Sequence, residues 1–273
     1  IITCGESDLL STTNQYITTN FLDEIKEGAQ ILKKITNVAK LCITIPKNLN
    51  IQSSFDSIQV FKTSMEYPAN IPAMVLKDHL NMILPAGKKP EDLGICFITA
   101  EAVVSLANAY KTKSAGFEKI LTVVGKQGTQ YRVKATIGTP LRKIFDTFSI
   151  HVNDLDRIVV GGPMTGFATF THHHPVRPDM DTIMVQDRDN IPELSDNPCV
   201  NCGKCIHICP VNIPVNILVR YLEANQYDEA ADKYDLESCI ECGLCAYTCT
   251  ARIPLYQYIR LGKHELLKLR ADA

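Results

Sequence analysis

Eight of the eleven cysteines of this chain occur in two copies of one pattern near the C-terminus. Each copy reads Cys-x-x-Cys-x-x-Cys-x-x-x-Cys, a spacing of thiolates that suits a cubane iron–sulfur cluster. In two-cluster ferredoxins the fourth cysteine of one run ligates the other cluster. We therefore expect two [4Fe–4S] clusters, one held by Cys199, Cys202, Cys205 and Cys249, and the other by Cys239, Cys242, Cys245 and Cys209.

Structural zinc sites and disulfide frameworks are the alternative uses of closely spaced cysteines. One zinc ion is satisfied by two Cys-x-x-Cys pairs, and the longer run has no use in that geometry. Dense disulfides suit small secreted domains, whereas this chain has 273 residues, of which 45% are hydrophobic. Gly203 and Gly243 follow the second cysteine of each run, where the backbone must pass close to inorganic sulfur. These features favour iron–sulfur clusters.

The two runs differ at the residue after the fourth cysteine. Pro210 follows Cys209, whereas Thr250 follows Cys249. Proline fixes φ and lacks an N–H group, so Thr250 adds a hydrogen-bond donor near the cluster expected at Cys199. Donors near sulfur tune the reduction potential of a cluster. We expect the two clusters to have unequal potentials, with the donor raising that of the first.

The sequence between and after the two runs has helical spacing of its apolar residues. A spacer of 29 residues separates Cys209 from Cys239. Pro214 begins one helical pattern in this spacer, a second short helix is expected at about 228–233, and Pro254 opens a third pattern after the second run. Residues 197–273 are therefore predicted to form an α-helical two-cluster ferredoxin domain.

Composition excludes several classes of function. Lys and Arg total 28 against 30 Asp and Glu, so the charge balance gives no support for a nucleic-acid partner. No apolar run is long enough to span a bilayer, and no secretory signal is visible. Iron–sulfur thiolates suit a reducing compartment, so a cytoplasmic location is expected. The chain begins Ile-Ile without an initiator Met, and we expect it to be processed or part of a longer product.

Residues 1–112 alternate strands with helices. Strands are expected near 1–3, 41–45, 58–61 and 94–98, and helices at about 20–39, 71–83 and 100–110, with Asn20 as an N-cap. Such alternation predicts an α/β domain with a parallel or mixed sheet.

Residues 113–170 have a different pattern. Two strands at 120–125 and 131–137 are joined by a turn at Gln127-Gly128, and a helix at 140–148 and a strand at 157–160 follow. This order predicts a small β-grasp unit. Residues 171–196 are expected to be an irregular, acidic linker, so the whole chain is an α+β multidomain protein.

Three stretches together resemble the C subunit of the Rnf electron-transport complex. They are 137–141 (IGTPL), 161–166 (GGPMTG) and the second cysteine run, Cys239 to Cys249, with the Ile-Pro-Leu-x-Gln-Tyr motif that follows at 253–258. The 29-residue spacer also matches. The resemblance covers essentially the whole chain, strongly from about residue 115 and faintly before it.

The resemblance implies a domain order and an electron path. In that family a flavin-binding domain, similar to the NADH-oxidising subunit of complex I, precedes a β-grasp (SLBB-like) domain and the ferredoxin domain. There NADH reduces FMN, and the clusters carry single electrons onward. The first 112 residues would then be a remnant of the flavin-binding fold.

The segment from Cys4 to Ile17 resembles the end of that flavin domain but has changed. The family has a Glu-Pro pair and then an Asp-Arg pair here, and neither survives in register between Glu6 and Gln15. The glycine-rich nucleotide loop is not in this sequence. Either preceding residues supply the flavin site, or the domain is a scaffold that has lost its FMN; we expect the scaffold.

Other residues have weaker indications. His172, His173 and His174 could ligate a metal or haem, but adjacent side chains seldom point the same way, and an exposed loop is expected. His207 is either a donor to a sulfide or simply exposed. Cys4, Cys42 and Cys96 are expected to be small core residues. The basic residues of the last helix either complement its C-terminal dipole or dock to an acidic partner or membrane; they are Arg260, Lys263, Lys268 and Arg270.

The sequence thus predicts an electron-transfer subunit of an Rnf-like redox complex, with no catalytic residues of its own. It would relay single electrons through two clusters between a flavin or cluster on a partner subunit and an acceptor. It would be peripheral at the cytoplasmic membrane through its partner subunits. Two alternatives stay open: a complete FMN-dependent NADH dehydrogenase subunit, and a structural subunit whose clusters only brace the fold.

Overall fold

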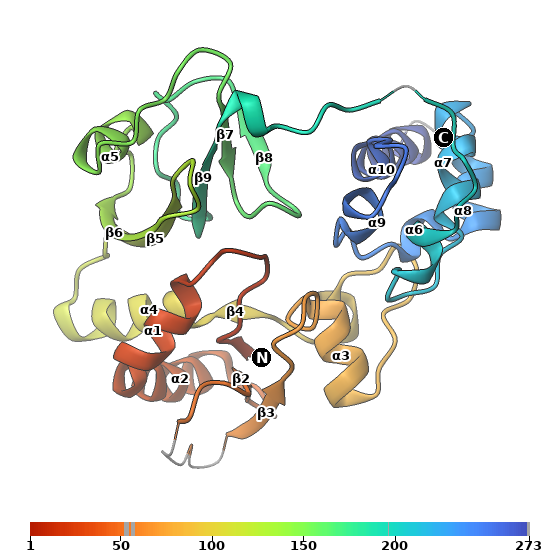
Figure 1. The fold of residues 1–273 in the computed structure, drawn as a ribbon. Coiled ribbons are helices and arrows are strands. Elements are labelled where there is room, and N and C mark those ends of the chain that lie inside the picture. Colours follow the sequence, from red (N-terminus) through yellow and green to blue (C-terminus); the bar gives the residue numbers. More distant parts are fainter. Residues whose placement is uncertain (52–54, 56–57, 196, 272–273) are drawn as a thin grey trace. The chain divides into compact units, whose positions relative to one another are not determined.

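The computed structural model describes residues 1–51, 55, 58–195 and 197–271. The chain divides into two compact units (Figure 1). The first comprises residues 1–81 and 90–191, and the second comprises residues 82–89 and 192–273. Position 196 at the end of the expected linker and positions 272–273 lie outside the described residues. The short segment 82–89, expected within the first domain, joins the second unit, where the Gly87 N–H donates to the carbonyl of Glu237 at 3.4 Å.

The first unit begins with a four-stranded parallel sheet. Its strands are β1 (Ile2–Thr3), β2 (Cys42–Pro46), β3 (Gln59–Thr63) and β4 (Ile98–Thr99), in the order β3-β2-β1-β4. A 3₁₀ turn (Pro90–Leu93) precedes β4, which is shorter than the expected strand at 94–98. The parallel sheet confirms the α/β pattern of the sequence.

Four helices accompany this sheet: α1 (Thr13–Asn20), α2 (Leu22–Thr36), α3 (Pro72–Leu80) and α4 (Ala100–Thr112). The single helix expected at 20–39 is wrong at its start, because Asn20 ends α1 instead of capping α2. The side chains of Thr18, Thr19 and Asn20 donate back to carbonyls four residues earlier. Such bonds compete with the helical backbone, and the chain breaks at Phe21 (φ −125°, ψ 37°) before α2 begins.

Helices α2 and α4 pack so closely that Gly28 lies against the main chain of Val103. A Cβ at position 28 would overlap the Val103 carbonyl oxygen, and backbone cannot yield as a flexible side chain does. We expect Gly28→Ala to lower the free energy of unfolding by about 1–3 kcal/mol through overpacking, as measured by urea denaturation. Gly116→Ala is the control, because a Cβ there meets no atom within 4 Å. Equal stability of the two variants would contradict the prediction.

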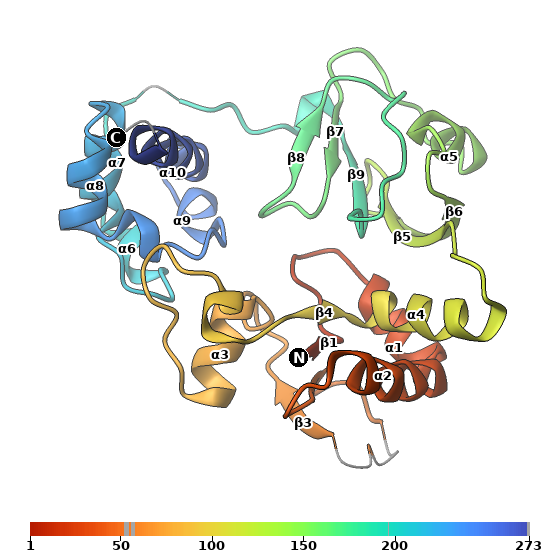
Figure 2. The same cartoon turned by 180° about the vertical axis from the view of Figure 1, so that it is seen from behind.

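The second half of the first unit is a five-stranded mixed sheet. Its strands are β5 (Glu118–Val124), β6 (Gln130–Thr136), β7 (Arg157–Val160), β8 (Phe167–Thr169) and β9 (Thr182–Gln186), in the order β6-β5-β9-β7-β8. The expected hairpin is present as the antiparallel pair β5–β6, and α5 (Leu141–Thr147) follows it. Figure 2 shows this sheet from behind.

Strand β9 corrects the expectation of a linker over residues 171–196. It runs parallel to β5 and antiparallel to β7, so it occupies the centre of the sheet. Val176 and Met180, which precede it, are buried with the core of this sheet. The strand's own residues are almost entirely buried. Within the expected linker the first unit continues to Ile191, one residue beyond the 3₁₀ turn Arg188–Asn190.

Buried hydrogen bonds and ion pairs connect α1 and α4 to the second sheet. The hydroxyl of Thr122 on β5 accepts from the Thr12 N–H at 3.1 Å and shares a 2.9 Å hydrogen bond with the Thr13 hydroxyl. Lys119, only 6% exposed, forms ion pairs with Glu101 of α4 and with Asp181 just before β9. These contacts fix the helices of the parallel sheet against the mixed sheet within one unit.

The second unit is helical throughout the part that the structure describes. It contains α6 (Lys204–His207), α7 (Val215–Glu223), α8 (Tyr227–Tyr234), a 3₁₀ turn (Leu236–Ser238), α9 (Leu244–Tyr247) and α10 (Leu255–Ala271). The helices expected after Pro214, at 228–233 and after Pro254 are all present. Among the described residues of the chain, no helix combines the length and apolar character needed to cross a bilayer.

Candidate metal centres

The two cysteine runs build the same backbone twice, 40 residues apart. Cys199 and Cys239 begin them, and the equivalent glycines, Gly203 and Gly243, both have φ of +75°. That left-handed conformation is easy for glycine and strained for other residues. Asn201 and Glu241, two positions earlier, share φ of +54°. The glycine in each run is therefore required by the turn that presents the first three cysteines.

The repeat continues through the fourth cysteine into the following helix. The N–H groups of Cys209 and Cys249 donate to the carbonyls of Ile206 and Ala246 at 3.1 and 3.3 Å. Each run then reaches a proline, which suits a helix start because its N–H would be unpaired there. Helices α7 and α10 begin at equivalent positions, and the pairs α6–α9 and α7–α10 pack together.

The structure brings four cysteines together around each of two pockets in this unit. One pocket is lined by Cys239, Cys242, Cys245 and, from the other run, Cys209. The other is lined by Cys199, Cys202, Cys205 and, again from the other run, Cys249. The fourth cysteine of each run thus lies beside the first three of the other run.

Burial makes several of these thiols poor acids in the absence of a metal. It raises the pKa of Cys239 to about 11 and that of Cys245 to about 12, with Cys239 and Cys242 adding to the effect on Cys245. Burial and the neighbouring Cys199 and Cys249 also raise the pKa of Cys205. Metal ligands must be deprotonated, so binding a metal centre here would release protons from these thiols.

No three or more His, Cys, Asp or Glu side chains come together to hold a single metal ion in the described ranges of the chain. Around one zinc ion the sulfurs stand about 2.3 Å from the metal. A cubane places four irons between its thiolates, so its ligands stand farther apart. The four-cysteine pockets and this finding are therefore compatible.

Thr250 contacts the sulfur of its own pocket. Its hydroxyl lies 3.4 Å from Sγ of Cys202, and this hydrogen bond is the largest factor that lowers the pKa of Cys202. The sequence singled out Thr250 because it replaces the proline of the first run.

Removing this hydroxyl should lower the reduction potential of one cluster. A donor to a ligand sulfur stabilises the more negative, reduced state. We expect Thr250→Val to shift the potential of the Cys199–Cys202–Cys205–Cys249 cluster to a more negative value, and Thr248→Val, whose hydroxyl donates to main-chain carbonyls instead, to leave it unchanged. A redox titration followed by EPR makes the comparison, and a shift in Thr248→Val alone would be the contrary result.

Lys263 is a residue of this unit that the cysteine pattern did not single out. Its ammonium group donates to the carbonyl oxygen of Cys239 at 2.6 Å and to Oε1 of Glu241 at 2.8 Å. In the first run Arg220 donates to Oδ1 of Asn201, the residue equivalent to Glu241, at 2.6 Å. The 40-residue offset relates Arg220 to Arg260, so an internal alignment of the two runs would have found the two arginines, whereas Lys263 aligns with Glu223.

The basic residues of α10 are paired with carboxylates. Arg260 and Lys263 lie beside Glu241, Lys268 beside Glu265, and Arg270 beside Asp232 and Glu237. Each of these basic residues therefore has a carboxylate partner within the second unit.

His172, His173 and His174 lie in a loop whose main chain is hydrogen-bonded to the start of α5. The carbonyls of His172 and His174 accept from the N–H groups of Arg142 and Leu141 at the start of α5, at 2.8 and 3.0 Å. His173 is exposed, and so is His207 beside Gly203. Of the three isolated cysteines, Cys4 and Cys42 are buried as expected, whereas Cys96 is exposed, which corrects the core assignment for that residue.

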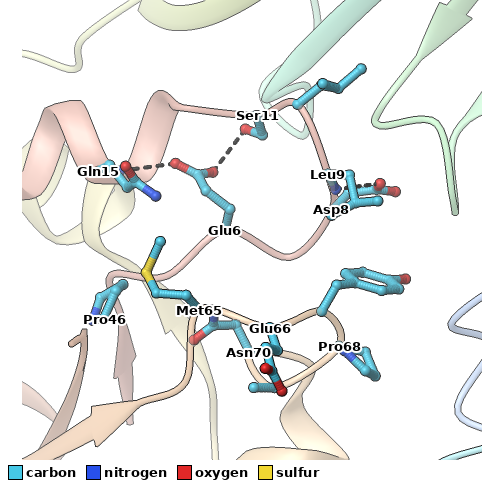
Figure 3. Close-up of a pocket in the computed structure, with 13 residues that line it drawn as sticks. Glu6, Asp8, Leu9, Ser11, Gln15, Pro46, Met65, Glu66, Pro68 and Asn70 are labelled. Atoms are coloured by element: carbon cyan, nitrogen blue, oxygen red, sulfur yellow. Dashed lines mark hydrogen bonds between the residues drawn. The ribbon is translucent and has the colours of Figure 1, made fainter. Parts of the chain in front are cut away.

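The segment that resembles the end of a flavin domain lines a pocket of the first unit (Figure 3). The carboxylate of Glu6 accepts from the Ser11 hydroxyl at 2.8 Å and from the Gln15 N–H, in the first turn of α1, at 2.9 Å. Burial raises the pKa of Glu6, and these two bonds oppose it. A carboxylate of the protein thus occupies the N-terminus of α1, and helix N-termini in general are positions that can bind anions such as phosphate.

The charge of the pocket does not fit a flavin phosphate. Among the residues that the structure describes, its lining includes the carboxylates of Glu6, Asp8 and Glu66 and contains no Lys, Arg or His. Asp8 instead holds the glycine loop after β7, accepting from the N–H groups of Met164 and Thr165 at 3.1 and 2.8 Å. Phosphate groups are bound by cations and backbone donors, so the described residues that line this pocket do not fit the phosphate of FMN.

Comparison with known proteins agrees with the geometry of the second unit. A family model described as a 4Fe-4S dicluster domain matches residues 198–253. The range spans all eight cysteines of the two runs. The chain therefore carries a domain of the type that holds two [4Fe–4S] clusters.

Curated relatives match nearly the full chain. The C subunit of the proton-translocating ferredoxin:NAD(+) oxidoreductase complex of Clostridium ljungdahlii is 28% identical over 89% of this chain and 55% of its own length. The C subunit of the ion-translocating oxidoreductase complex of Pasteurella multocida is 25% identical over 100% of this chain and 34% of its own length. This chain resembles the C subunit of the Rnf-type complexes. It spans about half the length, or less, of these curated relatives.

Solved structures support the fold alone. The chain matches an NAD+-reducing [NiFe]-hydrogenase in its H2-reduced state with a TM-score of 0.58 and 12% identity, over 96% of this chain and 56% of that one. The chain has a mixed α/β fold with a parallel sheet and also a helical domain that matches the 4Fe-4S dicluster model.

Proposed function

We propose that this chain is an iron–sulfur electron-transfer subunit of an Rnf-like, membrane-associated redox complex, and that it relays single electrons through two [4Fe–4S] clusters. The observation that carries the proposal is the pair of pockets, each lined by three cysteines of one run and the fourth of the other. The match to a dicluster domain supports it. The relatives' names support a partnership with other subunits of such a complex.

Crossed ligation is part of the proposal. Cys199, Cys202, Cys205 and Cys249 hold one cluster, and Cys239, Cys242, Cys245 and Cys209 hold the other. Each cluster then depends on both runs, which keeps the two centres close together. The clusters supply the one-electron chemistry. The chain ligates them, shields them with the apolar core of α7 and α10, and donates hydrogen bonds to their ligands.

The domain assignment supports the same function. We propose that residues 113–186 form a β-grasp unit of the SLBB type, since a hairpin, a helix and a last strand parallel to the first follow one another. The parallel sheet of residues 1–112 is then a scaffold related to flavin-binding subunits. This chain would attach to the cytoplasmic side of the membrane through its partner subunits.

The alternative is an FMN-dependent NADH dehydrogenase subunit whose nucleotide loop precedes Ile1. The acidic pocket beside Glu6 argues against flavin binding by the residues present. We therefore propose that a partner subunit supplies the electrons.

Anaerobic purification of the chain with its native partners tests the proposal. About eight irons and eight acid-labile sulfides per chain, without flavin released on denaturation, are the expected result. Dithionite should generate two interacting S = ½ EPR signals. Zinc in place of iron, or clusters that no biological potential reduces, would overturn the relay.

A further inference from the structure

The two halves of the ferredoxin domain differ in charge at equivalent positions. Lys263 on α10 lies 40 residues after Glu223, the last residue of α7. Arg260 and Arg220 are equivalent and both are arginines, whereas Glu241 stands where Asn201 does. Positions 241, 260 and 263 of the second half are thus Glu, Arg and Lys. The equivalent positions 201, 220 and 223 of the first half are Asn, Arg and Glu. Their formal charges sum to +1 and 0, respectively.

Lys263 lies where its charge can act on one metal centre. Its side chain is 23% exposed, and its ammonium group donates to the carbonyl of Cys239 itself. Glu241 is shared between Lys263 and Arg260, at 2.8 and 3.7 Å, so one carboxylate faces two cations and a positive charge is left beside this loop. Lys204 in the first half is exposed, so solvent and salt screen it.

We propose that Lys263 raises the reduction potential of the cluster bound by Cys209, Cys239, Cys242 and Cys245, and that it also positions the Cys239 loop. Reduction adds one negative charge to a cluster, and a nearby cation stabilises the reduced state more than the oxidised one. At the position equivalent to Lys263 the other pocket has Glu223, and the cation that lines that pocket is Arg220, which is also present in the second half as Arg260. The inference rests on the proposed function, because it requires that the clusters are bound.

The test is a redox titration of the reconstituted full chain followed by EPR, with the signal of this cluster assigned as the one missing from Cys242→Ala. In Lys263→Gln we expect about a tenfold loss of the reduced form at a fixed potential, equivalent to a shift of about 59 mV to more negative values. Lys263→Arg should keep most of the wild-type potential. Lys268→Gln is the matched control, since Lys268 lies on the same helix but pairs with Glu265.

A second variant should shift the reduction potential of this cluster in the opposite direction. Glu241→Gln removes the carboxylate that offsets Lys263, while the Glu241 main chain that contacts Cys239 Sγ remains. We expect it to shift the potential of the same cluster to more positive values. If Lys263→Gln fails to retain its clusters, the potential measured for Glu241→Gln tests the effect of the Lys263 charge instead.

Three results would overturn the inference: no shift in either variant, equal shifts of both clusters, or a shift in Lys263→Arg as large as in Lys263→Gln. Iron analysis separates this failure from that of the proposed function. A chain that binds eight irons but shows no shift refutes only the role of Lys263, whereas a chain that binds no clusters refutes the proposed function.

Discussion

Replacing Cys209 by alanine is expected to abolish the cluster of the second cysteine run and to leave that of its own run bound. The pocket lined by Cys239, Cys242 and Cys245 takes its fourth cysteine from position 209. A cluster with three of four thiolates is labile, so iron should fall from about eight to about four per chain. Cys249→Ala should have the converse effect, because Cys249 lines the pocket of Cys199, Cys202 and Cys205.

Paired variants identify which cluster each cysteine holds. If ligation is crossed, Cys209→Ala and Cys245→Ala lose the same EPR signal, and Cys249→Ala and Cys205→Ala lose the other. If each run holds its own cluster, Cys209→Ala instead matches Cys205→Ala. Cys96→Ala is the control, since this exposed cysteine lies in the first unit and lines neither pocket. It should retain both signals and all the iron.

The cysteines that line the two pockets are marked in the sequence by local features. The cysteine spacing, the glycine at a left-handed position and the proline before each helix all act within one run, and each has one structural use. The helices of this unit begin where Pro214 and Pro254 predict. The exception is the pairing of charges across the two runs, such as Lys263 with Glu241, which depends on how α10 packs against a loop 22 residues away.

Strand β9 could not be recognised from its own residues. It is five residues long and lies at the centre of its sheet, so its first four residues are buried and no alternation of polar and apolar residues marks it. Acidic residues on both sides, including Asp179, Asp181 and Asp187, gave the segment the character of a linker. One of these, Asp181, is part of an ion pair that forms only when β5 lies beside β9. Tertiary contacts therefore determine that this segment forms a strand and not a linker.

The same ion pair leads to the largest stability effect that we expect in the first unit. Lys119 is almost fully buried, and its ammonium group lies between the carboxylates of Glu101 and Asp181, the latter at 2.9 Å. Lys119→Met keeps the apolar stem but leaves two partly buried carboxylates without their cation. Breaking a buried charge cluster in this way costs about 3–5 kcal/mol, which should appear in urea denaturation as a large loss of unfolding free energy.

Two further measurements test the charge explanation. Lys134→Ala removes an exposed pair with Glu118 on the neighbouring strand, and it should cost less than about 1 kcal/mol. Glu101→Gln in the Lys119→Met background should recover part of the loss, because it removes one unpaired charge while an amide oxygen can still accept from the Ile120 N–H. A Lys119→Met variant as stable as Lys134→Ala would contradict the prediction.

The pH dependence of the Lys119 contribution has a defined sign. Burial disfavours the charged amine, but the carboxylates of Asp181 and Glu101 outweigh burial and raise the pKa of Lys119 above its usual value. A raised lysine pKa means that the native state holds the proton more tightly, so the contribution is fully present below the unfolded pKa of about 10.4 and is lost as the pH rises through the folded value. The stability difference between the wild type and Lys119→Met should therefore be constant from about pH 7 to 9 and shrink only at higher pH. A difference that instead shrank between pH 7 and 9 would mean that Lys119 titrates early, and the carboxylates would then not be the source of its stabilisation.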